Sequence, residues 1–273
     1  MADEDLGVLL IILDGLGDSR SSVLGNKSPL ESIEQVNMMG FKRRGATGLI
    51  DPISPGVPPG SDTSHLSLFG YDLSREYPGR GPFEAIGDGV PLREGEIAFR
   101  ANFATMELKG DGAYVSDRRA GRLPTAVTAN LASTLNEECG QVEGANFRLW
   151  PSLEHRAVLV VTGDGLSHQV TDNDPHSTGA PLLECLPLDE ALDRRGAERL
   201  SRLVNIWTRR CIEVLEGAGG NVERRKQGLP PGNVVLVRSP GVMARMTPFQ
   251  ERWGFKAGCV AAGKLYRGVA KML

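Results

Sequence analysis

An aspartate that directly follows an apolar run is the first residue with the means to do chemistry. Asp14 comes after residues 7–13 and is followed by Gly15 and Gly17. A carboxylate is a hard oxygen ligand for divalent metals, and glycines let the backbone turn tightly and a ligand come close. An Asx turn at the end of a strand would explain the same pattern without chemistry. A dinucleotide-binding fingerprint is excluded, because the third glycine is missing at the required spacing.

A serine near the start of an expected helix is the second such residue. Ser61 lies in the stretch PGSDTSH, just before a helix expected over residues 63–69. A helix N-terminus favours an alkoxide or a bound phosphate, but serine there is also a common capping residue. A serine hydroxyl is a poor nucleophile until a base or a metal activates it. Since neither a G-x-S-x-G elbow nor a Ser-His-Asp order is evident, a metal shared with a carboxylate such as Asp14 is the sharper hypothesis.

Arginines at three places could hold an anionic substrate, because guanidinium groups bind carboxylates and phosphates through paired hydrogen bonds. The run DRRAGR contributes three of them, and Arg80 lies between two glycines. A solvated basic loop, a supporting role at a hinge, and a structural role near a helix end are the alternatives. The candidate substrate contacts of basic type are Arg80, Arg118, Arg119, Arg122, Arg224, Arg225 and Lys256.

Several elements are needed to position these side chains. The uninterrupted apolar run at residues 7–13 predicts a strand buried on both faces of a central parallel sheet. Asp14 would then lie at its carboxyl end, where open α/β sheets hold their active sites. Alternating strand and helix patterns along the chain predict the α/β class. Further strands are expected at residues 157–162 and 233–237, helices at 28–43, 63–69, 200–215 and 257–272, and Gly- and Pro-rich connections at 51–60 and 75–95.

The bulk composition excludes some classes of protein. The 273 residues leave room for one large or two smaller domains, and a formal net charge of -3 gives no reason to expect binding to nucleic acid or to a membrane. The four cysteines are scattered without a C-x-x-C pair, which favours reduced thiols over disulfides or structural zinc. The acidic start lacks the pattern of a secretory signal, and no apolar run reaches membrane-spanning length. A cytoplasmic protein is expected.

An ordered set of motifs resembles archaeal-type cofactor-independent phosphoglycerate mutases, of the alkaline-phosphatase-like superfamily. The similarity runs over nearly the whole chain, and several motifs in the same order are far more specific than any one of them. The motifs are LLIILDGLGD (9–18), PGSDTSHLSLFGYD (59–72), YPGRGPFEAIGDGV (77–90), AFRANFAT (98–105), DRRAGR (117–122), HRAVLVV (155–161) and DNDPH (172–176).

The resemblance implies an activity and a mechanism. The protein would interconvert 3-phosphoglycerate and 2-phosphoglycerate in glycolysis and gluconeogenesis, without 2,3-bisphosphoglycerate. Ser61 would take the phosphoryl group as a phosphoserine, and Asp14 with Ser61 would ligate one or both of two divalent metals, manganese, zinc or magnesium. Arg118, Arg119 and Arg122 would contact the substrate. The DNDPH motif would lie in an inserted domain, so Asp172, Asp174 and His176 are expected to position substrate or transfer a proton.

The resemblance also implies the fold. An alkaline-phosphatase-like parallel-sheet domain is expected, of which this chain carries the N-terminal part, with an inserted α/β substrate-binding domain. Residues 1–75 would belong to the first, residues 76–255 to the inserted domain, and residues 256–273 to a helix that returns to the first.

In one respect the chain departs from the family. Family members continue beyond the helix that here reaches Leu273, and that portion carries the remaining metal ligands. With four histidines and no Asp-His pair, the complete two-metal site cannot be built from this sequence. The chain is expected to be a fragment, one product of a split gene completed by a partner chain, or a shortened relative. Another metal-dependent phosphatase or phosphotransferase activity and a non-catalytic role are the alternatives.

Overall fold

The computed structural model describes residues 7–110 and 112–273, so the acidic start at residues 1–6 lies outside the described residues. The chain forms two compact units, Met1–Leu68 and Phe69–Leu273. The three-part division expected from the sequence, with boundaries after residues 75 and 255, stays a prediction. Among the described residues no helix is long and apolar enough to cross a membrane.

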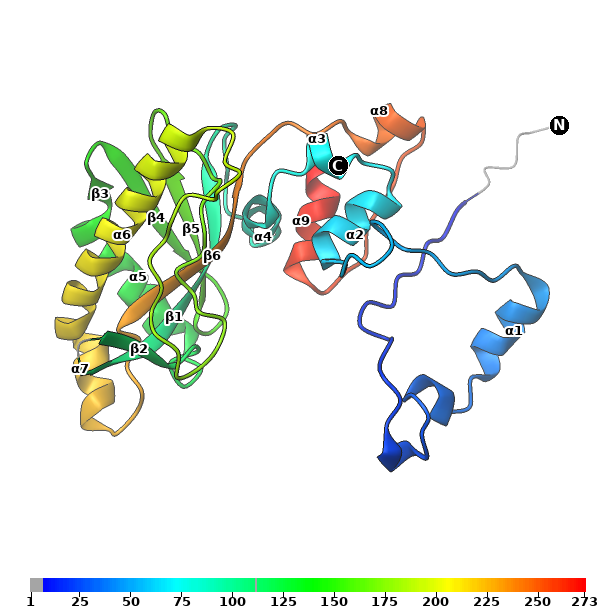
Figure 1. Cartoon of the computed structure of the whole chain (residues 1–273), viewed down its shortest axis with the longest axis horizontal. Helices are drawn as coiled ribbons and strands as arrows, with labels where there is room; N and C mark the ends of the chain where they lie inside the picture. The colour runs from blue at the N-terminus through cyan, green and yellow to red at the C-terminus, as the bar shows by residue number, and fades with distance from the viewer. Residues whose placement is uncertain (1–6, 111) are drawn as a thin grey trace. The chain divides into compact units, whose positions relative to one another are not determined.

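The first unit consists of short helices joined by extended chain (Figure 1). Its elements are η1 (Ser22–Leu24), η2 (Leu30–Ser32), α1 (Val36–Arg44) and α2 (Ser61–Leu68). The helix expected over residues 28–43 begins only at Val36, because the backbone of Gln35 leaves the helical region after the short turn of η2. The helix expected over residues 63–69 is confirmed as α2, which starts two residues earlier.

The strand predicted at residues 7–13 is not formed. These residues are extended but unpaired, and their apolar side chains are exposed, with Val8 at 87% and Ile11 at 68%. A strand buried on both faces needs hydrogen-bonded neighbours along both edges and helices over both faces. Among residues 7–68 no other strand is present to pair with it. The apolar run is therefore an uncovered surface of this unit.

The second unit is built on one mixed sheet-and-helix core. β1 (Ile97–Lys109) is the longest strand and pairs with β2, β5 and β6. The combination of a sheet with helices confirms the α/β class. Every described strand pairing is antiparallel, so this sheet is not the parallel one expected for the phosphatase-like part. The other strands are β2 (Gly112–Asp117), β3 (Gln141–Val142), β4 (Ala145–Pro151), β5 (Arg156–Thr162) and β6 (Val234–Val242).

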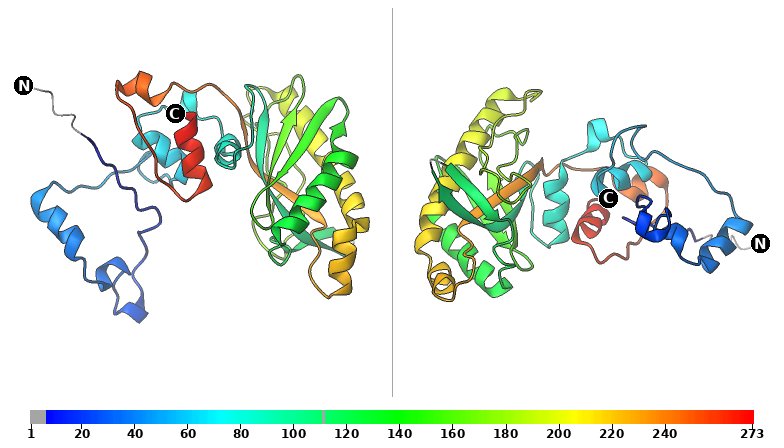
Figure 2. Two further views of the ribbon diagram at one scale, coloured as in Figure 1. Left: turned by 180° about the vertical axis from the view of Figure 1, so that it is seen from behind. Right: turned by 60° about the horizontal axis from the view of Figure 1, so that its bottom comes forward.

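Helices α5 (Thr125–Cys139) and α6 (Arg194–Gly217) lie on one face of this sheet, and Figure 2 shows them on the side away from α4. The apolar stripe predicted from Leu200 to Leu215 is confirmed as the buried face of α6. Its Trp207 stacks on Phe147 of β4 with ring centroids 5.6 Å apart. The main core therefore lies between the sheet and these two helices.

Residues 75–95, expected to be a loop, contain helices instead. α3 (Leu73–Glu76) is followed by α4 (Arg80–Gly87), which packs on β1 and on α9 (Lys264–Met272). The glycines that suggested a loop let these backbones approach closely: a Cβ on Gly81 would lie 1.8 Å from the carbonyl oxygen of Ala98. The unit is completed by α7 (Gly219–Lys226) and α8 (Phe249–Trp253), while α9 begins later than the expected residue 257.

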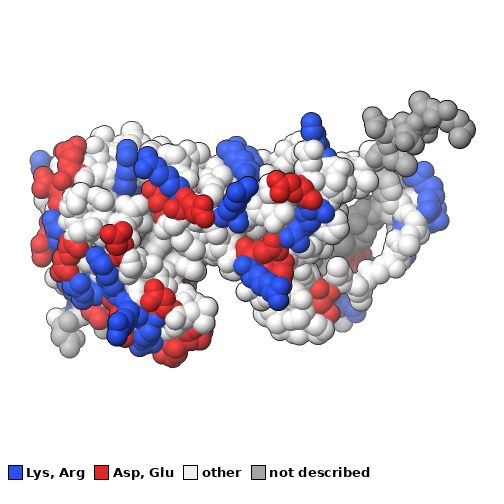
Figure 3. Space-filling model, turned by 90° about the horizontal axis from the view of Figure 1, so that it is seen from above, with Lys and Arg blue, Asp and Glu red and all other residues white. Residues whose placement is uncertain are grey.

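Charge is mixed over the surface in view in Figure 3, where blue basic and red acidic groups adjoin one another. This agrees with the small formal net charge of -3. A broad basic stripe of the kind that binds nucleic acid is not seen on the described part of that face.

Candidate functional site

Asp14 and Ser61 meet in the first unit, although 47 residues separate them in sequence. The Ser61 hydroxyl donates a hydrogen bond to Oδ2 of Asp14 at 2.9 Å. Asp14 is exposed, and Gly15 after it adopts a φ of 74°, which turns the chain away. Ser61 is the first residue of α2, and its side chain points to a distant carboxylate rather than to a helix N–H. Simple helix capping does not describe this contact.

The turn that holds Ser61 is fixed by its neighbours. The amide of Gly60 donates to Oγ1 of Thr63 at 3.1 Å, and Nδ1 of His65 donates to the Ser61 carbonyl oxygen at 2.5 Å. His65 itself is buried on this helix. The main chain of Ser61 is thereby held at the helix N-terminus, where the unpaired N–H groups favour negative charge.

The chemistry of this pair fits a divalent metal, since a carboxylate and a hydroxyl are both hard oxygen donors. A complete site needs more donors. Within residues 7–110 and 112–273, no three His, Cys, Asp or Glu side chains are grouped so that they could hold a metal ion. Asp14 and Ser61 supply at most three oxygen atoms, two from the carboxylate and one from the hydroxyl.

A second polar cluster lies in the second unit around the buried carboxylate of Asp174. Arg118 donates to it twice, from Nε to Oδ1 at 2.9 Å and from Nη2 to Oδ2 at 2.7 Å. Arg238 on β6 donates from Nη1 to Oδ2 at 2.9 Å. Burial opposes ionisation of Asp174, but these bonds and the backbone N–H of His176 hold its pKa below the ordinary value.

A second carboxylate, that of Glu84, also contacts two arginines. Oε1 of Glu84 accepts from Nε of Arg80 at 3.2 Å and ion-pairs with Nε of Arg100 at 3.1 Å. Arg100 lies opposite Arg238 in the β1–β6 pairing. Burial, and the charges of nearby arginines including Arg238, lower the pKa of Arg100 to about 10, even though Glu84 opposes the shift. The guanidinium groups at this place are therefore partly buried, and their positive charges outnumber the negative charges that pair with them.

The loop that carries the DNDPH motif is attached to β6 by its asparagine. Asn173 is fully buried and accepts a hydrogen bond from the amide of Val237 at 2.6 Å. The two flanking aspartates are thereby held beside Arg238. Asp172 accepts from the amide of Ser239 at 2.7 Å and from Nε2 of the exposed His176 at 2.9 Å. The motif lies beside Arg118, because its Asp174 pairs with both Arg118 and Arg238. Its expected role in positioning substrate or transferring a proton stays a prediction.

The other two arginines of the DRRAGR run lie in a turn at the surface. Arg119 and Arg122 are exposed. The turn itself is held by Asp117, whose two carboxylate oxygens accept from the amides of Arg119 and Gly121 at 2.8 and 2.7 Å. Ala120, Gly121 and Arg122 follow with positive φ, so the carboxylate stabilises an unusual turn.

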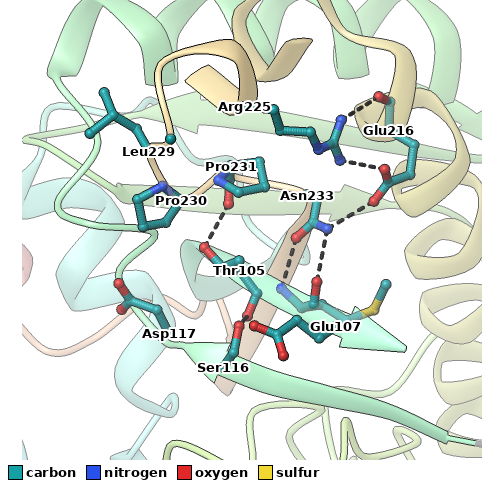
Figure 4. Close-up of a pocket in the computed structure, with 12 residues that line it drawn as sticks. Thr105, Glu107, Ser116, Asp117, Glu216, Arg225, Leu229, Pro230, Pro231 and Asn233 are labelled. Atoms are coloured by element: carbon teal, nitrogen blue, oxygen red, sulfur yellow. Dashed lines mark hydrogen bonds and ion pairs between the residues drawn. The ribbon is translucent and has the colours of Figure 1, made fainter. Parts of the chain in front are cut away.

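The remaining candidates lie outside the arginine cluster. Arg224 is buried and donates to the carbonyl oxygens of Pro230 and Ala120, which is a structural role. Arg225 lines a cleft of about 580 Å³ and points toward Glu216, as Figure 4 shows. Lys256 is exposed between α8 and α9.

Sequence reasoning missed Glu84, Arg100 and Arg238. The available signal was a single charge within an apolar strand: Arg100 interrupts Ile97–Ala101, and Arg238 follows four apolar residues of β6. Charged side chains at such positions are buried only when they are paired. Their partners are distant in sequence, so the signal could not say what they pair with.

Comparison with known proteins places the chain in a family. Residues 43–221 match the family described as 2,3-bisphosphoglycerate-independent phosphoglycerate mutase. Relatives with that name from Ignicoccus hospitalis and Methanopyrus kandleri are 46% and 43% identical to this chain. The matches cover 98% and 97% of this chain but 64% and 62% of the relatives, so the chain spans just under two thirds of their length.

Solved structures agree. A cofactor-independent phosphoglycerate mutase from Thermoplasma acidophilum is 38% identical with a TM-score of 0.59, covering 94% of this chain and 65% of that one. A protein from Pyrococcus horikoshii is 31% identical with a TM-score of 0.70, covering 95% and 57%. On the family match and these similarities, the chain belongs to the 2,3-bisphosphoglycerate-independent phosphoglycerate mutase family.

Proposed function

We propose that this chain contributes the nucleophile and the substrate-holding arginines of a mutase that interconverts 3-phosphoglycerate and 2-phosphoglycerate. The observation that carries the proposal is the 2.9 Å hydrogen bond from Ser61 to Asp14 across 47 residues. Family membership supports the reaction class. Because the chain spans just under two thirds of its relatives, activity is proposed for the completed protein.

Ser61 acts as the nucleophile. Its Oγ forms a bond to phosphorus while the bond from phosphorus to the 3-oxygen of the substrate breaks. The serine gives up its proton, and the departing 3-oxygen takes one. After the bound glycerate reorients, its 2-hydroxyl attacks the phosphoserine and Ser61 recovers its hydroxyl. Asp14 orients the serine hydroxyl for the first step, because it accepts the hydrogen bond that fixes the oxygen lone pairs.

Two divalent ions, manganese, zinc or magnesium, complete this proposal. Asp14 and Ser61 would hold one or both, and the ions would lower the pKa of the serine hydroxyl and offset negative charge in the transfer. The further ligands would come from residues outside the described ones. The exposed apolar residues 7–13 support this view, since they have the composition of a central strand but lack neighbours among the described residues.

The arginine cluster supplies the second part of the proposal. Phosphoglycerate carries a carboxylate and a phosphate, and Arg80, Arg100, Arg118 and Arg238 outnumber the two carboxylates that bridge them. Positive charge that is partly withdrawn from water is stabilised when an anion binds. Arg119, Arg122, Asp172 and His176 remain proposed contacts at the edge of this cluster, while Arg224, Arg225 and Lys256 have less support.

The test is a mutase assay on the chain and its Ser61→Ala variant, each with and without added manganese, zinc or magnesium. Each is assayed alone and together with the segment of the Ignicoccus hospitalis relative that this chain does not match. We expect activity only in the completed, metal-loaded protein, and a loss of at least about a thousandfold in the variant, as nucleophile removal usually causes.

Ser67→Ala is the matched control, because it removes a hydroxyl from the same helix away from Asp14. It should retain activity. A [32P]phosphoryl label that becomes acid-stable on the native protein but not on Ser61→Ala would identify the intermediate. Full activity of Ser61→Ala would overturn the mechanism.

A further inference from the structure

We propose that Glu84 and Asp174 are positioning residues, each of which aligns a pair of arginines for an anionic ligand without touching that ligand itself. This inference rests on the proposed function, since it concerns how the same site recognises a phosphorylated acid. It assigns a role to Glu84, and it changes the role expected for Asp174 from substrate contact to support.

Asp174 has no capacity left for a ligand. Its side chain is 0% exposed, and each of its oxygens already accepts two hydrogen bonds. Oδ1 is used by Arg118 and the His176 amide, and Oδ2 by Arg118 and Arg238. A carboxylate so engaged fixes the planes of both guanidinium groups, which come from the end of β2 and from β6.

Glu84 does the same for the neighbouring pair. Its side chain is 15% exposed, and its Oε1 contacts the Nε atoms of both Arg80 and Arg100. Arg80 is one turn earlier on α4, whereas Arg100 projects from β1. One carboxylate oxygen thus joins an arginine of α4 to an arginine of β1 and fixes the distance between them.

The two arginine pairs adjoin one another. Arg100 and Arg238 are opposite each other in the β1–β6 ladder, so four guanidinium groups gather around two carboxylates. Nε of Arg238 is buried and lacks a hydrogen-bond partner in the described part of the chain. An unsatisfied buried donor beside excess positive charge is stabilised by a bound anion.

The positioning role can be separated from simple electrostatics because the two predict opposite signs. If Glu84 only lowered the local positive charge, its neutralisation would strengthen the binding of an anion. If it aligns Arg80 and Arg100, the same change loosens both arginines and weakens binding. Glu84→Gln keeps the size of the side chain but removes its charge and replaces one acceptor oxygen by an NH2 donor, so it is the variant to measure.

The experiment is calorimetric titration of the full chain with 3-phosphoglycerate and, separately, with inorganic phosphate. We expect Glu84→Gln to weaken binding of 3-phosphoglycerate by about tenfold, the loss of one hydrogen bond between charged groups. Glu198→Gln, which removes the same charge from an exposed ion pair on α6, should leave affinity unchanged. Thermal unfolding of each variant shows whether it remains folded, which matters most for Asp174→Asn because that carboxylate is fully buried.

A double-mutant cycle shows whether Glu84 acts through its arginine. In an Arg100→Met background, Glu84→Gln should weaken binding far less than it does in the native chain. Equal or tighter binding by folded Glu84→Gln, with normal binding by the native chain, overturns the positioning role alone. If the folded native chain binds neither probe, both this inference and the substrate-holding part of the proposed function are wrong, while the Ser61 assay still tests the nucleophile.

Discussion

Arg118 and Arg224 both belong to short basic runs in sequence, and the structure gives them different partners. Arg118 pairs with a buried carboxylate and retains a half-buried position beside other arginines. Within the described residues, Arg224 donates to the backbone carbonyl oxygens of Pro230 and Ala120 and ties α7 to two loops. Composition could not separate them, because the acceptor that each guanidinium meets is distant in sequence. Whether an arginine is a candidate for binding substrate or has a structural role therefore depends on its hydrogen-bond partner rather than on its residue type.

His155 is the residue whose protonation should affect stability most clearly. It is buried, and burial first, then the charge of Arg156, lowers its pKa from 6.5 to about 4, with a weaker contribution from Arg119. Glu154 and Asp117 oppose the shift. The unfolded chain therefore binds a proton at higher pH than the folded one.

The free energy of unfolding should accordingly be constant for this group above pH 6.5 and fall as pH is lowered from 6.5 towards 4. Urea unfolding at a series of pH values measures the fall, and His155→Gln should remove this component. Nuclear magnetic resonance of the His155 ring checks the cause directly. A titration midpoint near 6.5 in the folded protein would contradict the assignment.

Among the elements, those with strong apolar periodicity could be predicted from sequence and those built on glycine could not. β5 and α6 have uninterrupted or helical apolar patterns that specify their own burial. α4 has only five residues between Gly81 and Gly87, and its position depends on packing against β1 and against α9, which lies near the end of the chain. Local helix propensity carries no information about such contacts. The Asp14–Ser61 pair was predictable from motifs, whereas the Glu84 arginines needed the strand register.

Close packing of α4 on α9 gives a prediction for one glycine. A Cβ on Gly268 would lie 1.7 Å from the carbonyl oxygen of Phe83, so Gly268→Ala must push the two helices apart. We expect the free energy of unfolding to fall by roughly 1–3 kcal/mol, despite the better helix propensity of alanine. Thermal or urea unfolding measures the change.

Gly217→Ala on α6 is the control, because a Cβ there meets no atom within 4 Å. It should leave stability unchanged or raise it. Equal effects of the two substitutions would mean that the helices do not pack as closely as described.

The whole molecule combines a well-packed second unit with a first unit that leaves its most apolar segment uncovered. Residues 7–13, which include the exposed Leu10, have the apolar composition of a central strand but are not paired with another strand in the described part of the chain. The main core lies within the unit Phe69–Leu273. Exposed, unpaired apolar strands associate with other strands. The sequence could predict the apolar character of this run, but the expected strand is not formed, because pairing depends on residues outside the run itself.

We predict that the chain alone self-associates through residues 7–13, and that the unmatched segment of the Ignicoccus hospitalis relative, added as a separate polypeptide, replaces that contact with a defined complex. Leu10→Lys should prevent both, because a charge within a strand buried on both faces is costly. Val23→Lys, at a side chain that is 90% exposed outside the run, should prevent neither. Sedimentation velocity at several concentrations measures both kinds of association. If Leu10→Lys associates as strongly as the native chain, residues 7–13 are not the contact, and the metal ligands would have to join Asp14 and Ser61 by another route.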